Sequence, residues 1–201
     1  MTIGEAKHLI EVIQGDRLEA LWVCALTVGL RRGELLGLRW SDLDLPAGTL
    51  TVRQTLLRVD GQLRFSEPKT VRSRRTVPVP ERTVELLRAQ RRRQAAERLL
   101  AGERWRDFGL VFASTIGTPM EPRNLDRAWH AVRAQADLPW LRLHDLRHAC
   151  ATFLLASGAS PRRVMKTLGH SQISLTMNTY GHVLAEVERA AVDAAADRLF
   201  G

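Results

Sequence analysis

The sequence predicts an α+β fold, a mostly helical single domain with a small antiparallel three-stranded sheet. Apolar residues recur at helical spacing in the first quarter of the chain and again from about residue 81 onward. Between them, residues 49–79 alternate apolar and polar side chains, as in LTVRQTLLRV, which is the period of a strand. A chain of 201 residues with 45% hydrophobic composition can bury its own core, and no internal repeat divides it. We therefore expect one domain over 1–201.

Capping pairs predict the first two helices. Thr2 and Asp16 are each followed three residues later by glutamate, the capping-box spacing, which predicts helices at about 3–14 and 17–28. Gly29 then interrupts the pattern before a short amphipathic helix in GLRRGELLGLRW.

The alternating segment predicts the sheet. Asp60-Gly61 is a strong hairpin signal between two strands. The stretch QLRFSEPKTVRSRRTVPVP continues through a second turn near 68–73 into a third strand that ends near Val79.

Helices resume after the sheet. A helix at about 81–101 carries arginines on its exposed face and ends at Gly102. Ser160 and Pro161 form a capping signal for a later helix. The other predicted helices span 122–136, 144–156, 161–168, 173–179 and 183–199.

The charge balance favours a polyanionic partner. Lys and Arg number 30 against 22 acidic residues, giving a net charge of +8, and only three of the basic residues are lysine. A GC-rich coding sequence accounts for much of the preference for arginine over lysine, but not for the positive sign. Arginine forks suit phosphate, so nucleic acid is the expected partner class.

The cysteines and the apolar runs indicate a reduced compartment. Cys24 and Cys150 lie in the apolar runs LWVCAL and RHACATFLL without a CxxC partner, as expected of buried cysteines rather than disulfides or zinc ligands. The sequence has neither an apolar run long enough to span a membrane nor a signal-peptide pattern. We expect a cytoplasmic protein with no membrane partner.

The stretch RLHDLRHACATFLLASG holds the first candidate site residues. His144 and Arg147 are three apart on a predicted helix, so they share a face and could bind an anionic oxygen pair such as a phosphate. His144 and His148 also have the i, i+4 spacing of the H-E-x-x-H zinc motif, but the second position is Asp145 and no third ligand is apparent. Taken alone, His-x-x-Arg is more often an ordinary surface pair.

Other candidates are spread along the chain. Arg31 has Glu34 three residues later, where a carboxylate could hold the guanidinium in place. Lys69 lies at a predicted hairpin tip, His170 follows a helix end, and Tyr180 is the only tyrosine of the chain. Three cations, two imidazoles and one phenol suit phosphoryl transfer without a metal site: Arg31, Lys69, His144, Arg147, His170 and Tyr180.

Four motifs in order closely resemble the catalytic domain of tyrosine recombinases of the phage integrase type: GLRRGELLGLRW, PKTVRSRRTVPV, HDLRHACAT and LGHSQISLTMNTYGHV. The resemblance covers roughly residues 2–183. The resemblance implies that Tyr180 is the nucleophile and that Arg31 and Arg147 are the two active-site arginines. It also implies that Lys69 is the β-hairpin lysine and that His144 and His170 are the two active-site histidines.

The implied activity is site-specific DNA recombination of the integrase type, through a covalent 3′-phosphotyrosyl intermediate and without metal, ATP or other cofactor. In this chemistry the arginines and His170 stabilise charge on the non-bridging oxygens. His144 accepts the phenol proton and Lys69 protonates the leaving 5′ oxygen. The implied partners are double-stranded DNA, further copies of the chain in a homo-tetramer on recombination sites, and accessory directionality proteins. The implied location is the bacterial nucleoid, with a phage or mobile element as the source.

Two regions around this set carry further expectations. Arg72, Arg74 and Arg75 are expected to contact DNA phosphates, with a solvated loop as the alternative for each. The family's N-terminal DNA-binding domain is expected to be absent. The C-terminal helical tail 183–201 is expected to dock on a neighbouring protomer, with docking on its own domain as the alternative.

Two other functions use similar features. A type IB topoisomerase shares this active-site set, and a non-catalytic DNA-binding module would be expected to lack a catalytic residue. The order of LGH and tyrosine, with every catalytic position present, favours an integrase.

Overall fold

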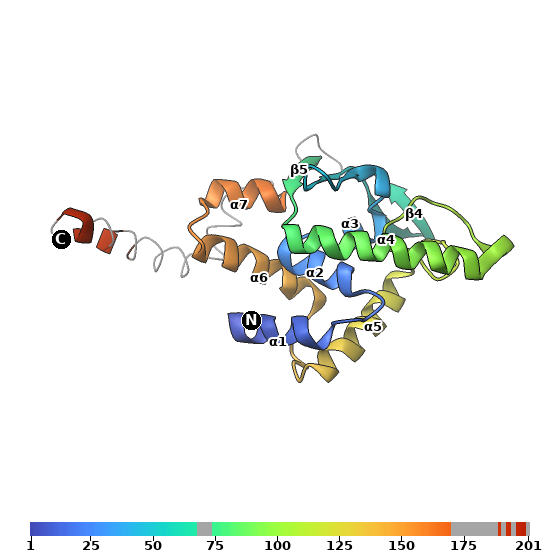
Figure 1. Ribbon diagram of the computed structural model, residues 1–201, viewed down its shortest axis with the longest axis horizontal. Coiled ribbons are helices and arrows are strands. Elements are labelled where there is room, and N and C mark those ends of the chain that lie inside the picture. Colours follow the sequence, from blue (N-terminus) through green and yellow to red (C-terminus); the bar gives the residue numbers. More distant parts are fainter. Residues whose placement is uncertain (68–73, 170–188, 190–191, 194–195, 200–201) are drawn as a thin grey trace.

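A computed structural model describes residues 1–67, 74–169, 189, 192–193 and 196–199 of the chain. Helices form most of this part, and two small antiparallel sheets lie against them (Figure 1). The predicted helix at 173–179 lies outside the described residues. Of the tail 183–201, only the last three of these ranges are described, in helical conformation.

The first two helices are α1 (Ile3–Val12) and α2 (Glu19–Thr27). The predicted capping box of α1 is confirmed, because Glu5 N donates to Thr2 Oγ1 at 3.1 Å and Thr2 N donates to Glu5 Oε2 at 2.6 Å. The predicted cap of α2 by Asp16 is wrong: α2 begins at Glu19, and Asp16 Oδ1 accepts instead from Leu18 N in the preceding turn.

The strands form two sheets rather than the single three-stranded sheet expected from residues 49–79. One sheet has the strand order β1-β2-β5, and the other is the hairpin β3-β4. The Asp60-Gly61 turn of the hairpin is confirmed, with both residues at positive φ. The strands are β1 (Leu43–Asp44), β2 (Thr49–Val52), β3 (Thr55–Val59), β4 (Gln62–Ser66) and β5 (Arg75–Pro78).

The two-sheet arrangement follows from pairing between distant segments. Strand β2 pairs on one side with β1 and on the other with β5, so that Leu50 lies opposite both Leu43 and Val77. The hairpin instead packs on the short helix α3 (Arg32–Gly37). Gly33 and Gly37 permit this close approach, since a Cβ on Gly33 would lie 2.3 Å from Thr55 Oγ1.

The later helices agree with the predicted ranges within one residue at each end. They are α4 (Glu81–Ala101), α5 (Pro122–Gln135), α6 (Leu143–Ala156) and α7 (Pro161–Leu168). Ser160 caps α7 as expected, and Gly169 ends it in the left-handed conformation with φ of 67°.

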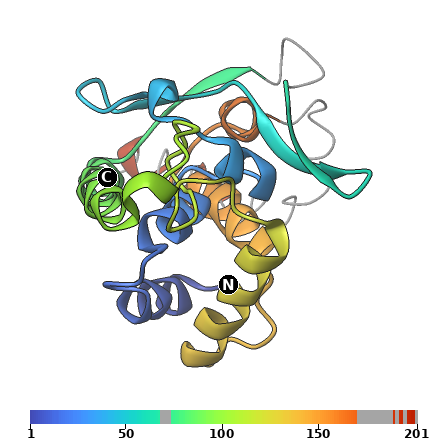
Figure 2. The ribbon, with the colours of Figure 1, turned by 90° about the vertical axis from the view of Figure 1, so that its right-hand side faces the viewer.

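Helix α2 forms the centre of the core. Seven consecutive residues of α2, from Ala20 to Leu26, are buried, and the helix packs against both α4 and α6. The Trp22 ring lies 5.2 Å from the ring of Trp129 on α5. Figure 2 shows the strands along one side of this helical assembly. Burial of an aliphatic side chain stabilises the fold by about 1.5–3 kcal/mol, so this helix anchors the segments on either side of it.

Both cysteines are free and buried, and burial raises the pKa of the Cys24 and Cys150 thiols to about 12. Within the described ranges, every helix is too short or too polar to span a bilayer.

Candidate active site

The structure brings together the described members of the candidate set. Arg31, Glu34, Arg147 and His144 lie around the C-terminal end of α7 and the start of α6. The other candidates, Lys69, Arg72, His170 and Tyr180, lie outside the described residues.

Gly29 shapes the backbone that precedes α3. Its φ is 70°, and a Cβ there would lie 2.5 Å from Leu168 Cδ2 and 3.1 Å from Cys150 Sγ. Only glycine fits this combination of positive φ and close packing without strain. The chain therefore turns tightly between α2 and α3, and the Gly29 carbonyl faces Arg147 on α6.

Arg31 stands at the N-terminus of α3, and Glu34 on the first turn holds it. Arg31 Nη1 donates to Glu34 Oε1 at 2.9 Å, and the Arg31 backbone N donates to Glu34 Oε2 at 2.8 Å. The Glu34 side chain is buried, whereas that of Arg31 is 42% exposed. The carboxylate thus fixes a guanidinium that still reaches solvent, as the spacing predicted.

The DNA-contact prediction for Arg75 is wrong. Its side chain is only 3% exposed, and both terminal nitrogens bond Glu34, Nη1 to Oε1 at 3.0 Å and Nη2 to Oε2 at 2.9 Å. The sequence did carry a signal for this burial. Val77 and Val79 face the core, and the period of two along β5 places Arg75 on the same face.

Glu34 is ionised because two arginines surround it. Burial alone would raise the pKa of Glu34, but the bonds and charges of Arg75 and Arg31 outweigh burial and hold that pKa below its usual value. With three guanidiniums and one carboxylate, Arg31, Arg75, Arg147 and Glu34 together form a positively charged cluster.

The three arginines share the C-terminal end of α7. Arg75 Nε donates to the Thr167 carbonyl at 2.7 Å, Arg147 Nη2 to that of Leu168 at 2.6 Å, and Arg31 Nη2 to that of Gly169 at 2.9 Å. Carbonyls at a helix C-terminus lack intrahelical partners and carry partial negative charge, so cations stabilise them. Arg147 Nη1 also donates to the Gly29 carbonyl. These hydrogen bonds connect strand β5 and helices α3 and α6 to the C-terminal end of α7.

His144 lies on the first turn of α6, partly exposed to solvent. Burial, followed by the charges of His148 and Arg147, lowers the pKa of His144 below its usual value, and Arg31 acts in the same direction while Asp145 opposes. The imidazole is therefore neutral at pH 7 and can accept a proton. The His148 ring packs edge-on against the His144 ring, with centroids 4.8 Å apart and planes at 88°.

Arg74 lies on the surface, where the prediction of a DNA contact stays open. Arg74 Nη2 is 2.8 Å from Glu67 Oε2, and both side chains are more than half exposed. An exposed ion pair of this kind is weak, so it leaves the guanidinium available for a polyanion.

The described residues contain no cluster of three or more His, Cys, Asp or Glu side chains arranged to hold a metal ion. His144 and His148 contact each other edge to face, with Asp145 bonded to Arg142. The zinc interpretation of this motif therefore lacks a third ligand in the described part of the chain.

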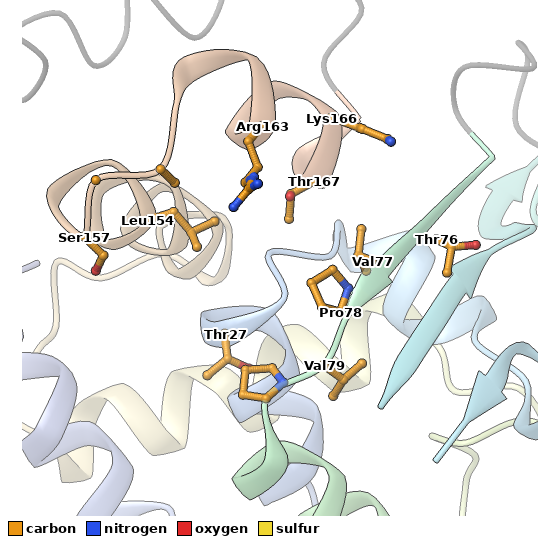
Figure 3. Close-up of a pocket in the computed structure, with 13 residues that line it drawn as sticks. Thr27, Thr76, Val77, Pro78, Val79, Leu154, Ser157, Arg163, Lys166 and Thr167 are labelled. Atoms are coloured by element: carbon orange, nitrogen blue, oxygen red, sulfur yellow. The ribbon is translucent and has the colours of Figure 1, made fainter. Parts of the chain in front are cut away.

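A cavity of about 660 Å³ lies beside β5, α6 and α7. Figure 3 shows Arg163 of α7 directed into it and Lys166 directed away, with Val77 and Val79 on the opposite wall. Neither Arg31 nor any other described member of the candidate set lines this cavity.

Comparison with protein families matches residues 1–186 to the phage integrase family. A XerC-like tyrosine recombinase of Caldanaerobacter subterraneus subsp. tengcongensis is 35% identical, over 94% of this chain and 51% of that protein. An integrase of Saccharopolyspora erythraea is 35% identical, over 96% and 56%, and the ICEBs1 integrase of Bacillus subtilis is 30% identical, over 97% and 53%. The chain thus spans about half the length of the curated relatives it matches.

Solved structures confirm the predicted fold class. The Tn1549 transposon integrase, determined in complex with transposon right end DNA, has a TM-score of 0.78 at 25% identity, over 98% of this chain and 65% of that one. The XerA recombinase has a TM-score of 0.75 at 24% identity, over 97% and 64%. With the family match over residues 1–186, these likenesses place the chain: it belongs to the phage integrase family.

Proposed function

We propose that this chain is the catalytic part of a site-specific DNA recombinase of the integrase type, with Tyr180 as the nucleophile. The observation that carries the proposal is the convergence of Arg31 and Arg147 on adjacent carbonyls at the end of α7. From that point the chain continues directly into His170 and then to Tyr180. The names of the relatives and the DNA complex of the Tn1549 integrase support a DNA substrate.

The chemistry follows from the charges of the cluster. Attack by the Tyr180 oxygen on a phosphodiester increases the negative charge on the two non-bridging oxygens. Arg31 and Arg147 are held in place before DNA arrives, so they can stabilise this charge without reorganising. In the proposal His170 adds a further hydrogen bond to the same oxygens.

Proton transfers complete the reaction. The phenol of Tyr180 has an unperturbed pKa of about 10 and must lose its proton to attack. His144, which is neutral at pH 7, is the proposed acceptor. Lys69 is the proposed acid that protonates the departing 5′ oxygen. Because the tyrosyl phosphodiester keeps the energy of the broken bond, rejoining needs no ATP.

The proposed assembly is a homo-tetramer on double-stranded DNA, with the tail 183–201 docked on a neighbouring protomer and accessory proteins setting direction. In the bacterial cell this places the protein at the nucleoid. Because the relatives are about twice as long, we expect binding by this chain alone to be weak and strongly salt-dependent.

A covalent-adduct assay tests the proposal. A nicked duplex of attachment-site DNA, taken from beside the gene, loses its cut fragment by diffusion and so traps the cleaved state. The protein and its Tyr180→Phe variant are incubated with this duplex and run on a denaturing gel. We expect a covalent protein–DNA band with the wild type and none with Tyr180→Phe.

The other outcomes separate the alternatives. A band that appears only after fusion to the N-terminal part of a relative would place the deficit in binding. No band in either form would contradict the proposal and favour a non-catalytic DNA-binding module. Relaxation of supercoiled plasmids without regard to sequence would favour a type IB topoisomerase.

A further inference from the structure

Arg75 is a buried cation whose described bonds are all internal. Its guanidinium donates through Nη1 and Nη2 to both oxygens of Glu34 and through Nε to the Thr167 carbonyl. With a side chain only 3% exposed, Arg75 is not placed to touch a phosphate of DNA. An arginine buried in this way needs partners that compensate its lost hydration, and here those partners belong to two other elements.

The partners of Arg75, Glu34 and the end of α7, also hold Arg31 and Arg147, the two proposed phosphate-binding arginines. Glu34 holds Arg31 at 2.9 Å, and Thr167 immediately precedes the two residues whose carbonyls bind Arg147 and Arg31. The contact at the end of α7 is tight, since a Cβ on Gly169 would lie 2.8 Å from Arg75 Nη1. A shift of Arg75 would therefore move both Glu34 and the end of α7.

We propose that Arg75 is a positioning residue for DNA cleavage, which fixes Glu34 and the end of α7 so that Arg31 faces the scissile phosphate. This inference rests on the proposed function of the chain. In the absence of Arg75, the Glu34 carboxylate has Arg31 as its remaining guanidinium partner among the described residues. Glu34 can then take a bidentate pairing with Arg31 and draw it away from the phosphate.

The charge-preserving variant Arg75→Lys tests this role. A lysine keeps the positive charge but offers a compact ammonium in place of the planar fork, so it cannot bond both Glu34 oxygens and the Thr167 carbonyl in the same geometry. We expect cleavage of the nicked duplex to slow by about 10²-fold, the effect of a small misplacement of a catalytic group.

A second substrate distinguishes positioning from loss of folded protein. In this duplex a methyl group replaces one non-bridging oxygen of the scissile phosphate, which removes the charge that Arg31 stabilises. The readout is the cleavage rate on the unmodified, charged duplex divided by the cleavage rate on this neutral methylphosphonate duplex. This ratio does not depend on the fraction of folded protein. We expect the ratio to fall at least about tenfold in Arg75→Lys, as one charge-stabilising donor is lost.

Arg17 provides a matched control. Arg17 Nε and Nη2 bond both oxygens of Glu97 at 2.7 and 2.9 Å, and Nη2 also donates to the Ala113 carbonyl at 2.9 Å. The partners are of the same kinds as those of Arg75, both oxygens of one glutamate and one backbone carbonyl, but they belong to α4 and a distant loop, and Arg17 is 30% exposed. We expect the rate ratio of Arg17→Lys to equal that of the wild type, and Arg31→Lys to lower the ratio as Arg75→Lys does.

Each outcome decides the inference. An unchanged ratio in Arg75→Lys, with a wild type that forms the adduct, would overturn the role of Arg75 and leave the proposed function intact. Failure of the wild type on the charged duplex, even after fusion to a relative's N-terminal part, would overturn the proposed function first. Arg75→Gln serves if Arg75→Lys does not fold. If neither variant folds, Arg75 is a residue of folding only and the inference is wrong.

Discussion

At the scale of single residues, the charge of the site depends on a few buried bonds. The pKa of Glu34 lies below its usual value because the bonds and charges of Arg75 and Arg31 outweigh its burial. The pKa of His144 is lowered because burial and the charges of His148, Arg147 and Arg31 outweigh Asp145. Both protonation states are the ones that the proposed chemistry needs: a carboxylate to hold an arginine and an imidazole to accept a proton.

The state of His144 predicts the pH dependence of cleavage. A base acts in its neutral form, so the rate is retained above the pKa of His144 and lost as the pH falls through it. Because this pKa lies below the usual value of about 6.5, single-turnover cleavage should keep more than half of its full rate at pH 6.5. The measurement is the rate of adduct formation between pH 5 and 8.

Two neighbours should move this midpoint in opposite directions. The charge of His148 lowers the pKa of His144, so His148→Gln should shift the acid limb to higher pH. Asp145 raises it, so Asp145→Asn should shift the limb to lower pH, and an asparagine can still accept from the Arg142 backbone. Shifts in the same direction, or none, would rule out His144 as the group that titrates.

At the scale of elements, Gly29 in the turn between α2 and α3 allows α6 and α7 to pack closely against that turn. Gly29→Ala should destabilise the fold by about 2–4 kcal/mol, combining the cost of left-handed backbone with that of overpacking against Leu168 and Cys150. The measurement is the free energy of unfolding in urea.

Gly15→Ala separates the two costs. Gly15 has φ of 80° and no atom within 4 Å of its would-be Cβ, so this variant should lose only the backbone part, about 1–2 kcal/mol. Equal losses in the two variants would show that packing at Gly29 contributes nothing.

The sequence predicted elements whose signals are local. The Thr2 capping box, the Asp60-Gly61 turn and the Ser160 cap each depend on residues within a few positions, and the structure has all three. It did not predict β1, which is two residues long and exists through pairing with β2. The prediction of a DNA contact for Arg75 overlooked the period of two along β5, which indicated burial, and its partners Glu34 and Thr167, 41 and 92 residues away, gave no local signal.

At the scale of the whole molecule, net charge and its distribution govern encounter with DNA. The chain carries +8, and Arg74 lies on the surface in a weak ion pair. Each phosphate contact contributes about 0.9 to the slope of log K against log salt. The double variant Arg72→Ala, Arg74→Ala should therefore reduce the magnitude of this negative slope by up to about 2. The measurement is DNA binding between 50 and 200 mM salt.

A second double variant that removes the same charge elsewhere tests whether DNA binds near residues 72 and 74. Arg98 and Arg104 are exposed near the C-terminal end of α4, the end farthest from α7 in Figure 1. Their double alanine variant should leave the slope unchanged. If the slope for the pair at 72 and 74 is also unchanged, these two arginines make no phosphate contact.

The central claim, that Tyr180 becomes joined to DNA, is tested most directly by locating the bond. The covalent complex formed on the nicked duplex is digested with nuclease and trypsin, and the peptides are sequenced by mass spectrometry. We expect a nucleotide attached through its 3′ phosphate to Tyr180, in the peptide that follows Lys166. Attachment at any other residue, or through a 5′ phosphate, would contradict the account.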